Sequence, residues 1–194
     1  VLMEQSGRTV KKGSMELGGH APFRVFDDAD LDAAVEGAMM CKFRNTGQTC
    51  VCANRIYVQD SVYDAFAEKL AEKVKTLKVG YGLEEGVNLG PLIDLAGLEK
   101  AEEHVEDAVS KGAKVVIGGK RHELGGSFYQ PTLLTGVTTD MKVTHEETFG
   151  PVAPLFRFKD EDEALARAND TEFGLAAYFY ARDLGRVWRI SEGL

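Results

Sequence analysis

The chain has 194 residues, 44% of them hydrophobic, which is enough for one domain with a substantial core. Its net charge of −8 and the lack of any basic run argue against nucleic acid or an anionic membrane as a partner. No apolar run approaches the roughly 20 residues that span a bilayer, and no signal peptide is recognised. Three cysteines, two of them separated by one residue, do not form a disulfide framework and favour a reducing, cytoplasmic setting.

Helical patterns stand at both ends of the chain. Residues 1–12 are typical of the tail of a helix, and residues 183–190 form a second helical pattern without a stop signal. There is no initiator methionine at the start. We therefore expect a fragment of a longer protein.

Strands alternate with helices between these ends. The acidic residues 27–30 are expected to cap a helix that ends at Phe43, and Ser61 is expected to cap the next one. Asp94 is expected to cap a third, with Leu98, Ala101, Val105 and Val109 facing inward. Helices are predicted at 31–43, 61–77, 94–111 and 161–168, and strands at 22–26, 55–58, 114–117, 130–134, 152–158 and 176–180, with 114–117 buried. This alternation predicts an α/β fold with an at least partly parallel sheet.

The glycines of residues 80–86 imitate a dinucleotide-binding fingerprint. The last glycine is one position late, and a helix rather than a strand precedes it. We predict a turn there.

Cys50 lies in a polar, glycine-containing loop between a helical and a strand pattern. Arg44 and Arg55 flank the loop, an environment that favours the thiolate, which is the nucleophilic form of cysteine. Cys41, in contrast, is expected on the apolar face of its helix. Cys50 is therefore a candidate nucleophile, with an unreactive loop cysteine as the alternative.

Three motifs in order carry a resemblance to a known family: E-L-G-G at 16–19, T-G-Q-T-C at 46–50 and E-E-T-F-G-P-V at 146–152. With this spacing, the chain resembles the aldehyde dehydrogenase superfamily over essentially its whole length. The resemblance implies a catalytic domain over residues 1–194, built as a three-layer αβα sandwich with a mostly parallel sheet. Residues 1–15 would be the tail of an upstream cofactor-binding domain.

The resemblance also implies an activity, the oxidation of a small aldehyde to its carboxylic acid. The cofactor would be NAD or NADP, with NADP slightly favoured, and the full-length protein would be a homo-oligomer. Because the family keeps its cofactor-binding domain in the upstream half, we expect the isolated chain not to turn over.

Site roles follow from the resemblance residue by residue. Cys50 would be the nucleophile and Glu16 the base that activates the hydrolytic water. The backbone of Leu17 would lie near the nicotinamide, and Gly18 would leave room for it. Glu147 would accept hydrogen bonds from the ribose hydroxyls, and Phe149 would pack beside the ring. Taken alone, Glu16 would more simply be a solvated carboxylate, and Glu147 part of a charged surface pair with Glu146, which we leave at the surface.

Arg44 stands six positions before Cys50, where it is similar to the substrate-carboxylate ligand of succinate-semialdehyde dehydrogenases. A guanidinium binds a carboxylate through two hydrogen bonds, which would orient a short ω-oxo acid. Alternatively, Arg44 caps its own helix or pairs with a surface acid. Glutarate semialdehyde and lactaldehyde stay open as substrates.

Two rival functions use the same residues. The first is a cysteine hydrolase or acyl-transfer enzyme that needs Cys50 and Glu16 but no nicotinamide. The second is a non-catalytic binding module with a redox-sensitive loop. No metal site is expected, because C-x-C alone is weak and His20, His104, His122 and His145 are placed at turns or on the surface.

Cys52, two positions after Cys50, is a candidate redox partner that would close a strained disulfide and switch off the nucleophile. We expect dithiothreitol to restore peroxide-inactivated protein less well when Cys52 is replaced by Ser. Equal recovery with and without Cys52 would exclude the switch.

Overall fold

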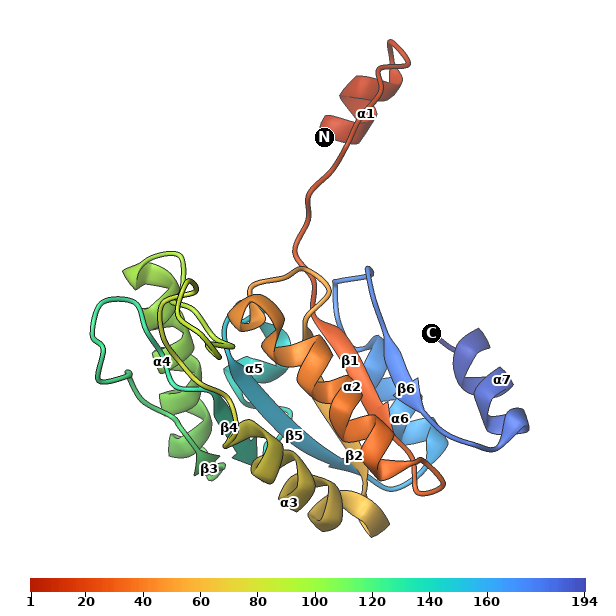
Figure 1. Cartoon of the computed structure of the whole chain (residues 1–194). Helices are drawn as coiled ribbons and strands as arrows, with labels where there is room; N and C mark the ends of the chain where they lie inside the picture. Colours follow the sequence, from red (N-terminus) through yellow and green to blue (C-terminus); the bar gives the residue numbers. More distant parts are fainter.

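The structure is a computed structural model that describes all 194 residues. Residues 1–18, none of which is buried, lead away from a body made of one sheet and its covering helices (Figure 1). The strands are β1 (Ala21–Val25), β2 (Ala53–Gln59), β3 (Lys114–Ile117), β4 (Thr132–Thr135), β5 (Val152–Phe158) and β6 (Tyr178–Tyr180). The helices are α1 (Leu2–Gly7), α2 (Leu31–Phe43), α3 (Tyr63–Val74), α4 (Leu95–Ser110), α5 (Lys142–His145), α6 (Glu161–Asn169) and α7 (Leu184–Glu192), with 3₁₀ turns at Arg44–Gly47 and Asp60–Val62.

The six strands form one sheet in the order β3-β4-β5-β2-β1-β6. Only β3 runs antiparallel to its neighbour, β4, and every other pair is parallel. The expected mostly parallel sheet is therefore confirmed. Because β5, β2 and β1 are adjacent and parallel, the segments that lead into these three strands meet at the same end of the sheet, where the three strands begin.

Side chains of successive strand residues point to opposite faces, and each face has its own core. On one face, Phe23 and Ile56 pack with Phe66 and other residues of α2 and α3. On the other, Tyr57 and Phe156 pack with residues of α4, α6 and α7. The result is the expected three-layer αβα arrangement (Figure 1).

Two predicted helix caps are present. The Asp30 carboxylate accepts hydrogen bonds from the backbone N–H groups of Asp32 and Ala33, both at 3.1 Å, and starts α2. The Asp94 carboxylate accepts one from Gly97 at 2.8 Å and starts α4. Each bond satisfies an N–H that the first helical turn leaves without a partner.

The predicted start of α3 and end of α1 are wrong. Ser61 caps no helix, because the chain first makes the Asp60–Val62 3₁₀ turn, and α3 then begins at Tyr63 without a side-chain cap. Helix α1 ends at Gly7 rather than near residue 12.

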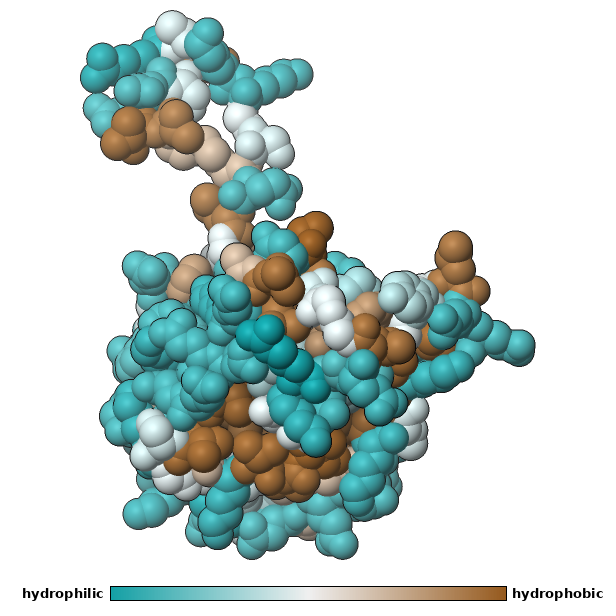
Figure 2. All heavy atoms as spheres, turned by 90° about the vertical axis from the view of Figure 1, so that its left-hand side faces the viewer, coloured by the Kyte–Doolittle hydropathy of each residue, from teal (hydrophilic) through white to brown (hydrophobic).

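Two burial predictions are also wrong. Val109 is 45% exposed, because the inward stripe of α4 closes at Ala108, three residues after Val105. The strand at 114–117 forms but is not buried, since β3 lies at the edge of the sheet and leaves Val115 and Val116 partly exposed. Figure 2 faces the side of the molecule that carries α4 and β3 and shows hydrophobic atoms at its surface. Residues 80–86 lie outside every helix and strand, as predicted for a turn, and no helix has the length and apolarity to cross a membrane.

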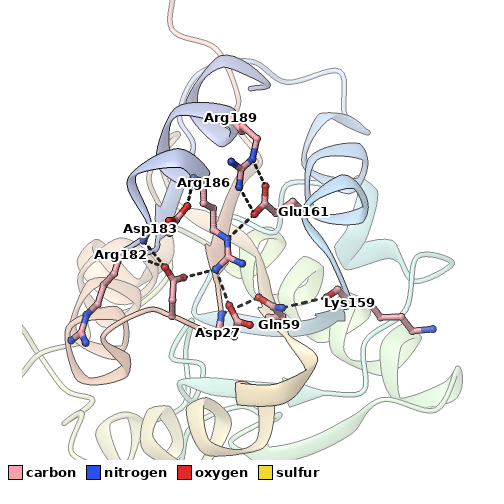
Figure 3. A network of polar contacts seen from close by, with 9 residues as sticks. Asp27, Gln59, Lys159, Glu161, Arg182, Asp183, Arg186 and Arg189 are labelled. Atoms are coloured by element: carbon pink, nitrogen blue, oxygen red, sulfur yellow. Dashed lines mark hydrogen bonds and ion pairs between the residues drawn. The ribbon is translucent and has the colours of Figure 1, made fainter.

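Helix α7 is held to the body by a charge network around Arg186 (Figure 3). Arg186 Nε donates to Glu161 Oε1 at 2.9 Å, its Nη1 donates to Asp27 Oδ1 at 2.8 Å, and its guanidinium lies 4.9 Å from the centre of the Phe26 ring. Arg189 Nε donates to Glu161 Oε2 at 2.8 Å. The hydrogen bonds from Arg189 and Arg186 lower the pKa of Glu161 from 4.5 to about 2.

We expect acid to loosen α7. A carboxyl whose pKa is lower in the folded state stabilises the fold above pH 4.5, and this contribution is lost as the pH falls towards 2. Trp188, the only tryptophan, lies in α7 and reports its mobility. Its fluorescence anisotropy should fall in this window before far-ultraviolet circular dichroism changes.

Arg186→Met should produce the same loosening at pH 7, with a loss of roughly 1–2 kcal/mol, on the scale of up to about 1 kcal/mol for each exposed ion pair. Unchanged Trp188 anisotropy in this variant at pH 7 would show that the network does not hold α7.

Candidate active site

The three sequence motifs meet at the end of the sheet where the neighbouring strands β1, β2 and β5 begin. Residues 16–19 lead into β1, the Cys50 loop leads into β2, and residues 146–151 lead into β5. These strands are neighbours and run in one direction. Segments separated by about 130 positions in the chain are thus brought into contact by the sheet alone, as the contact from Gly19 to Glu147 shows.

Gly18 and Gly19 make the closest contacts between the motifs. A Cβ atom on Gly19 would stand 1.7 Å from the carbonyl oxygen of Cys50, so only glycine fits there. The Gly19 N–H donates to Glu147 Oε1 at 3.1 Å. A Cβ atom on Gly18 would stand 2.8 Å from Glu147 Oε2. Cys50, the glycine pair and Glu147 therefore form one packed unit.

The loop before Cys50 has an unusual backbone. Asn45, Thr46 and Gly47 have φ values of 51°, 59° and 76°, three consecutive residues in the left-handed region. This conformation costs non-glycine residues on the order of 1 kcal/mol each and is found preferentially at functional sites. A Cβ atom on Gly47 would stand 2.2 Å from the Gly150 carbonyl oxygen, so this part of the loop rests on the third motif.

Hydrogen bonds hold the loop in this shape. Within it, the Asn45 side chain donates to the Gln48 carbonyl at 3.0 Å, and the Gln48 side chain donates back to the Asn45 carbonyl at 3.2 Å. Gln48 Oε1 also accepts from the Ile93 N–H at 2.9 Å. Beyond Cys50, the Tyr178 hydroxyl donates to the Val51 carbonyl at 2.9 Å. The predictions from sequence placed Tyr178 only within the strand 176–180 and did not include it among the site residues.

The Cys50 side chain is half-buried and forms no hydrogen bond, although the backbone around it is fixed. No histidine is bonded to it, which removes the usual base of a cysteine hydrolase from the site. A reagent can therefore reach a thiol whose position is set by the loop.

Arg44 is exposed and forms no ion pair or side-chain hydrogen bond. It lies with Val51 and Tyr178 on the wall of a largely apolar cavity of about 410 Å³. Arg44 does occupy the C-cap position of α2, as one alternative had it, but its side chain bonds no carbonyl of that helix and pairs with no surface acid. Its guanidinium remains available to an anion beside the residue that follows Cys50.

Glu16 and Leu17 are not brought into contact with Cys50. Both are exposed, on the segment that leads from the projecting residues into β1. In the third motif, Glu147 is half-buried, and Phe149 is 40% exposed with a left-handed φ of 52°. The structure therefore brings the candidate nucleophile, Cys50, together with the candidate ribose ligand, Glu147. It leaves the candidate base, Glu16, three residues before Gly19 and without contact to Cys50.

The prediction that all four histidines lie at turns or on the surface is wrong for His20 and His104, which are buried. His20 Nε2 lies 2.8 Å from the Thr144 carbonyl oxygen and donates to it. Burial, followed by the charge of Arg55, lowers the pKa of His20 to about 3, so it is neutral near pH 7. His104 bonds to Thr148 and, at 3.3 Å, to Glu146, which is exposed at the surface as predicted and also contacts this buried group.

Cys52 is fully buried and directed away from solvent. Its Sγ atom lies 3.2 Å from the Nζ atom of Lys42, a lysine that is also fully buried. Both Cys50 and Cys52 are free thiols. Lys42 and its second partner, Asn54, were not recognised from the sequence, because a lysine near the end of a helix ordinarily reaches solvent.

We expect Gly19→Ala to disable the site, because a methyl group 1.7 Å from the Cys50 carbonyl forces the loop to move. In the full-length parent that we expect to contain this chain, kcat/KM should fall at least about 100-fold, which corresponds to about 2.7 kcal/mol. Gly82→Ala is the matched control, because nothing lies within 4 Å of a Cβ atom there. A Gly19→Ala variant with activity within threefold of wild type would contradict the packed unit.

Comparison with known proteins identifies the family that shares this arrangement. The model of the aldehyde dehydrogenase family matches residues 1–194. The chain is 66% identical over 193 residues to succinate-semialdehyde dehydrogenase [NADP(+)] GabD of Escherichia coli (strain K12), covering 100% of the chain and 40% of that protein. It is 66% identical over 194 residues to 3-sulfolactaldehyde dehydrogenase of Pseudomonas putida, with the same coverage.

Among solved structures, succinate-semialdehyde dehydrogenase from Burkholderia pseudomallei matches with a TM-score of 0.96 and 64% identity, over 100% of this chain and 40% of that one. The chain thus spans about two fifths of the length of these relatives. On this similarity of sequence and fold, the chain belongs to the aldehyde dehydrogenase family.

Proposed function

We propose that this chain is the catalytic domain of an NAD(P)-dependent aldehyde dehydrogenase that oxidises a small anionic aldehyde, with succinate semialdehyde as the first candidate. The observation that carries this proposal is the packed unit of Cys50, Gly19 and Glu147. The two relatives named above are called dehydrogenases of succinate semialdehyde and of 3-sulfolactaldehyde, one bearing a carboxylate and the other a sulfonate.

In the proposed reaction the Cys50 thiolate adds to the aldehyde carbonyl and forms a tetrahedral thiohemiacetal with a negatively charged oxygen. The backbone N–H of Cys50 forms no hydrogen bond within the chain and can donate to this oxygen. A bound nicotinamide cofactor would supply the hydride acceptor, and loss of the hydride would leave a thioester on Cys50. Water deprotonated by Glu16 then attacks the thioester, which releases the carboxylic acid and returns the Cys50 thiolate.

Glu16 as the base is supported by its place in the chain. It precedes Gly19 by three residues, and a chain of that length spans at most about 11 Å. Since Gly19 touches the Cys50 backbone, the Glu16 carboxylate is tethered near the nucleophile even though the two side chains are not in contact.

The residues around Glu147 fit the ribose end of a nicotinamide cofactor. One carboxylate oxygen accepts from Gly19, and the other stands where Gly18 offers no side chain. A carboxylate so placed can accept from ribose hydroxyls, and the exposed ring of Phe149 can pack against an aromatic cofactor. Leu17 would contribute its backbone. NADP is the slightly favoured cofactor, as in the name of the Escherichia coli relative.

Arg44 is the proposed ligand of the substrate's anionic group. It combines an unpaired guanidinium with an apolar cavity whose wall includes Val51, next to the nucleophile. A short ω-oxo acid would place its aldehyde at Cys50 and its carboxylate at Arg44. Assembly of the parent protein into a homo-oligomer and its cytoplasmic location remain predictions from the family resemblance.

We expect Arg44→Ala in the full-length parent to lose ten- to a hundredfold in kcat/KM for succinate semialdehyde, because a hydrogen bond to a charged group contributes about 1.5–3 kcal/mol. Acetaldehyde, which has no carboxylate, should be oxidised almost as well as by wild type. Formation of reduced nicotinamide measures both reactions.

Two samples complete this assay. Cys50→Ser should form no reduced nicotinamide, and the isolated chain of 194 residues should form none because it lacks most of the relatives' length. An equal loss with both aldehydes would make Arg44 a structural residue. Aldehyde oxidation by Cys50→Ser would overturn the proposed mechanism itself.

A further inference from the structure

Lys42 is a buried charged group close in sequence to the nucleophile, and the proposed mechanism does not use it. It lies in the last turn of α2 with no exposed surface, and it forms no ion pair. Its Nζ atom donates to Asn54 Oδ1 at 2.8 Å and to Cys52 Sγ at 3.2 Å. Burying an ammonium group without a carboxylate costs several kcal/mol. A lysine kept in such a place calls for a reason beyond packing.

The contacts of Lys42 join the two ends of the segment 44–51, which contains Cys50 and is called the nucleophile loop below. Lys42 stands just before the loop, and Cys52 stands just after it. The Lys42 ammonium donates to Cys52 Sγ, and the Cys52 thiol donates back to the Lys42 carbonyl oxygen at 3.6 Å. This reciprocal pair of hydrogen bonds fixes the distance between Lys42 and Cys52, the residues at the two ends of the strained segment that contains Cys50.

The second partner extends this connection to the other motifs. Asn54 Nδ2 donates to the Gly19 carbonyl at 3.4 Å while its Oδ1 accepts from Lys42. Gly19 in turn touches the Cys50 carbonyl and donates to Glu147. Lys42 is therefore at the base of a continuous set of contacts that reaches the nucleophile loop, the glycine pair and the candidate ribose ligand.

We propose that Lys42 is a positioning residue for the chemistry of Cys50, acting through Cys52 and Asn54 to hold the nucleophile loop against Gly19. This inference rests on the proposed function, since it assumes that Cys50 is the nucleophile. In this proposal the hydrogen-bond partner of the reduced Cys52 thiol is Lys42.

Lys42→Met is the informative variant, because methionine fills similar volume without charge or donors. The change removes the desolvation cost of the ammonium but leaves Asn54 Oδ1 without its donor. The midpoint of thermal unfolding is therefore measured beside the kinetics, so that a positioning role and a purely structural role give different results. Lys73→Met is the matched control, since Lys73 lies on the exposed side of α3 and pairs with Glu36 on the surface.

The test uses the full-length parent protein. We measure kcat, the KM values for succinate semialdehyde and NADP, and the rate at which iodoacetamide alkylates Cys50 across pH 6–9, with Cys50 identified by peptide mass. For Lys42→Met we expect kcat and the alkylation rate to fall at least tenfold at every pH, with KM values within threefold. Lys73→Met should match wild type in all of them.

Lys42→Met with kcat and alkylation rate within twofold of wild type would overturn the proposal. If Lys42→Met does not fold, Asn54→Asp decides, because aspartate keeps an acceptor for Lys42 and adds a compensating charge but cannot donate to Gly19. A tenfold lower kcat in Asn54→Asp supports the proposal, and an unchanged kcat overturns it. Activity that survives in Cys50→Ser would instead refute the proposed function, so the two failures are distinguishable.

Discussion

The close approach of Gly19 to the Cys50 carbonyl is the constraint on which the rest of the site depends. With no room for a Cβ atom between them, the entry to β1 and the entry to β2 are fixed relative to each other at the backbone level. Side chains then add direction: the Gly19 N–H orients Glu147, and Asn54 holds the Gly19 carbonyl. A contact between backbones is stiffer than one between long side chains, which suits a thiol that must meet a carbonyl carbon within a narrow range of geometry.

The strain in the loop has a related explanation. Asn45 and Thr46 adopt left-handed backbone, which is strained for the β-branched Thr46 in particular. The hydrogen bonds of Gln48 and the contact of Gly47 with Gly150 maintain it. The loop is thereby turned so that the Cys50 side chain forms no internal bond. The carbonyl groups of its two neighbours, Thr49 and Val51, accept hydrogen bonds from the Cys52 N–H and the Tyr178 hydroxyl. Stored strain of this kind persists only where the surrounding structure imposes it. The surroundings here are the other two motifs, so the site and the fold stabilise each other.

Local patterns predicted much of this molecule, for reasons that can be stated. Helix α2 and its Asp30 cap, and β5 with its run of apolar residues, are determined by neighbours in the sequence. The strand order is not, because no pattern within β2 says that β1 and β5 lie on either side of it. The three motifs could be recognised by their spacing, but their contact at one edge required that order.

The errors about burial share a cause in long-range packing. His20 and Lys42 are polar by type, and only the covering elements make their sites dry. Burial lowers the pKa of His20, whereas the buried Lys42 ammonium donates two hydrogen bonds, one to Cys52 and one to Asn54 in β2. The burial prediction for β3 was wrong in the opposite direction. Its valines indicated a buried strand, but β3 is the outermost strand of the sheet and leaves them exposed.

The division between packed and projecting parts fits the order of the proposed reaction. In that proposal the Cys50 thiol, the Cys50 N–H as oxyanion donor and Glu147 as ribose ligand act together in the first step. All of them stand on segments that pack together where β1, β2 and β5 begin. Glu16 acts on water in a later step, and it stands on the exposed segment that the body of this chain does not cover. A base fixed against Cys50 throughout would occupy space that the aldehyde and the nicotinamide need first. We therefore infer that the body of the chain positions the nucleophile, whereas the packing of this body leaves the proposed base uncovered.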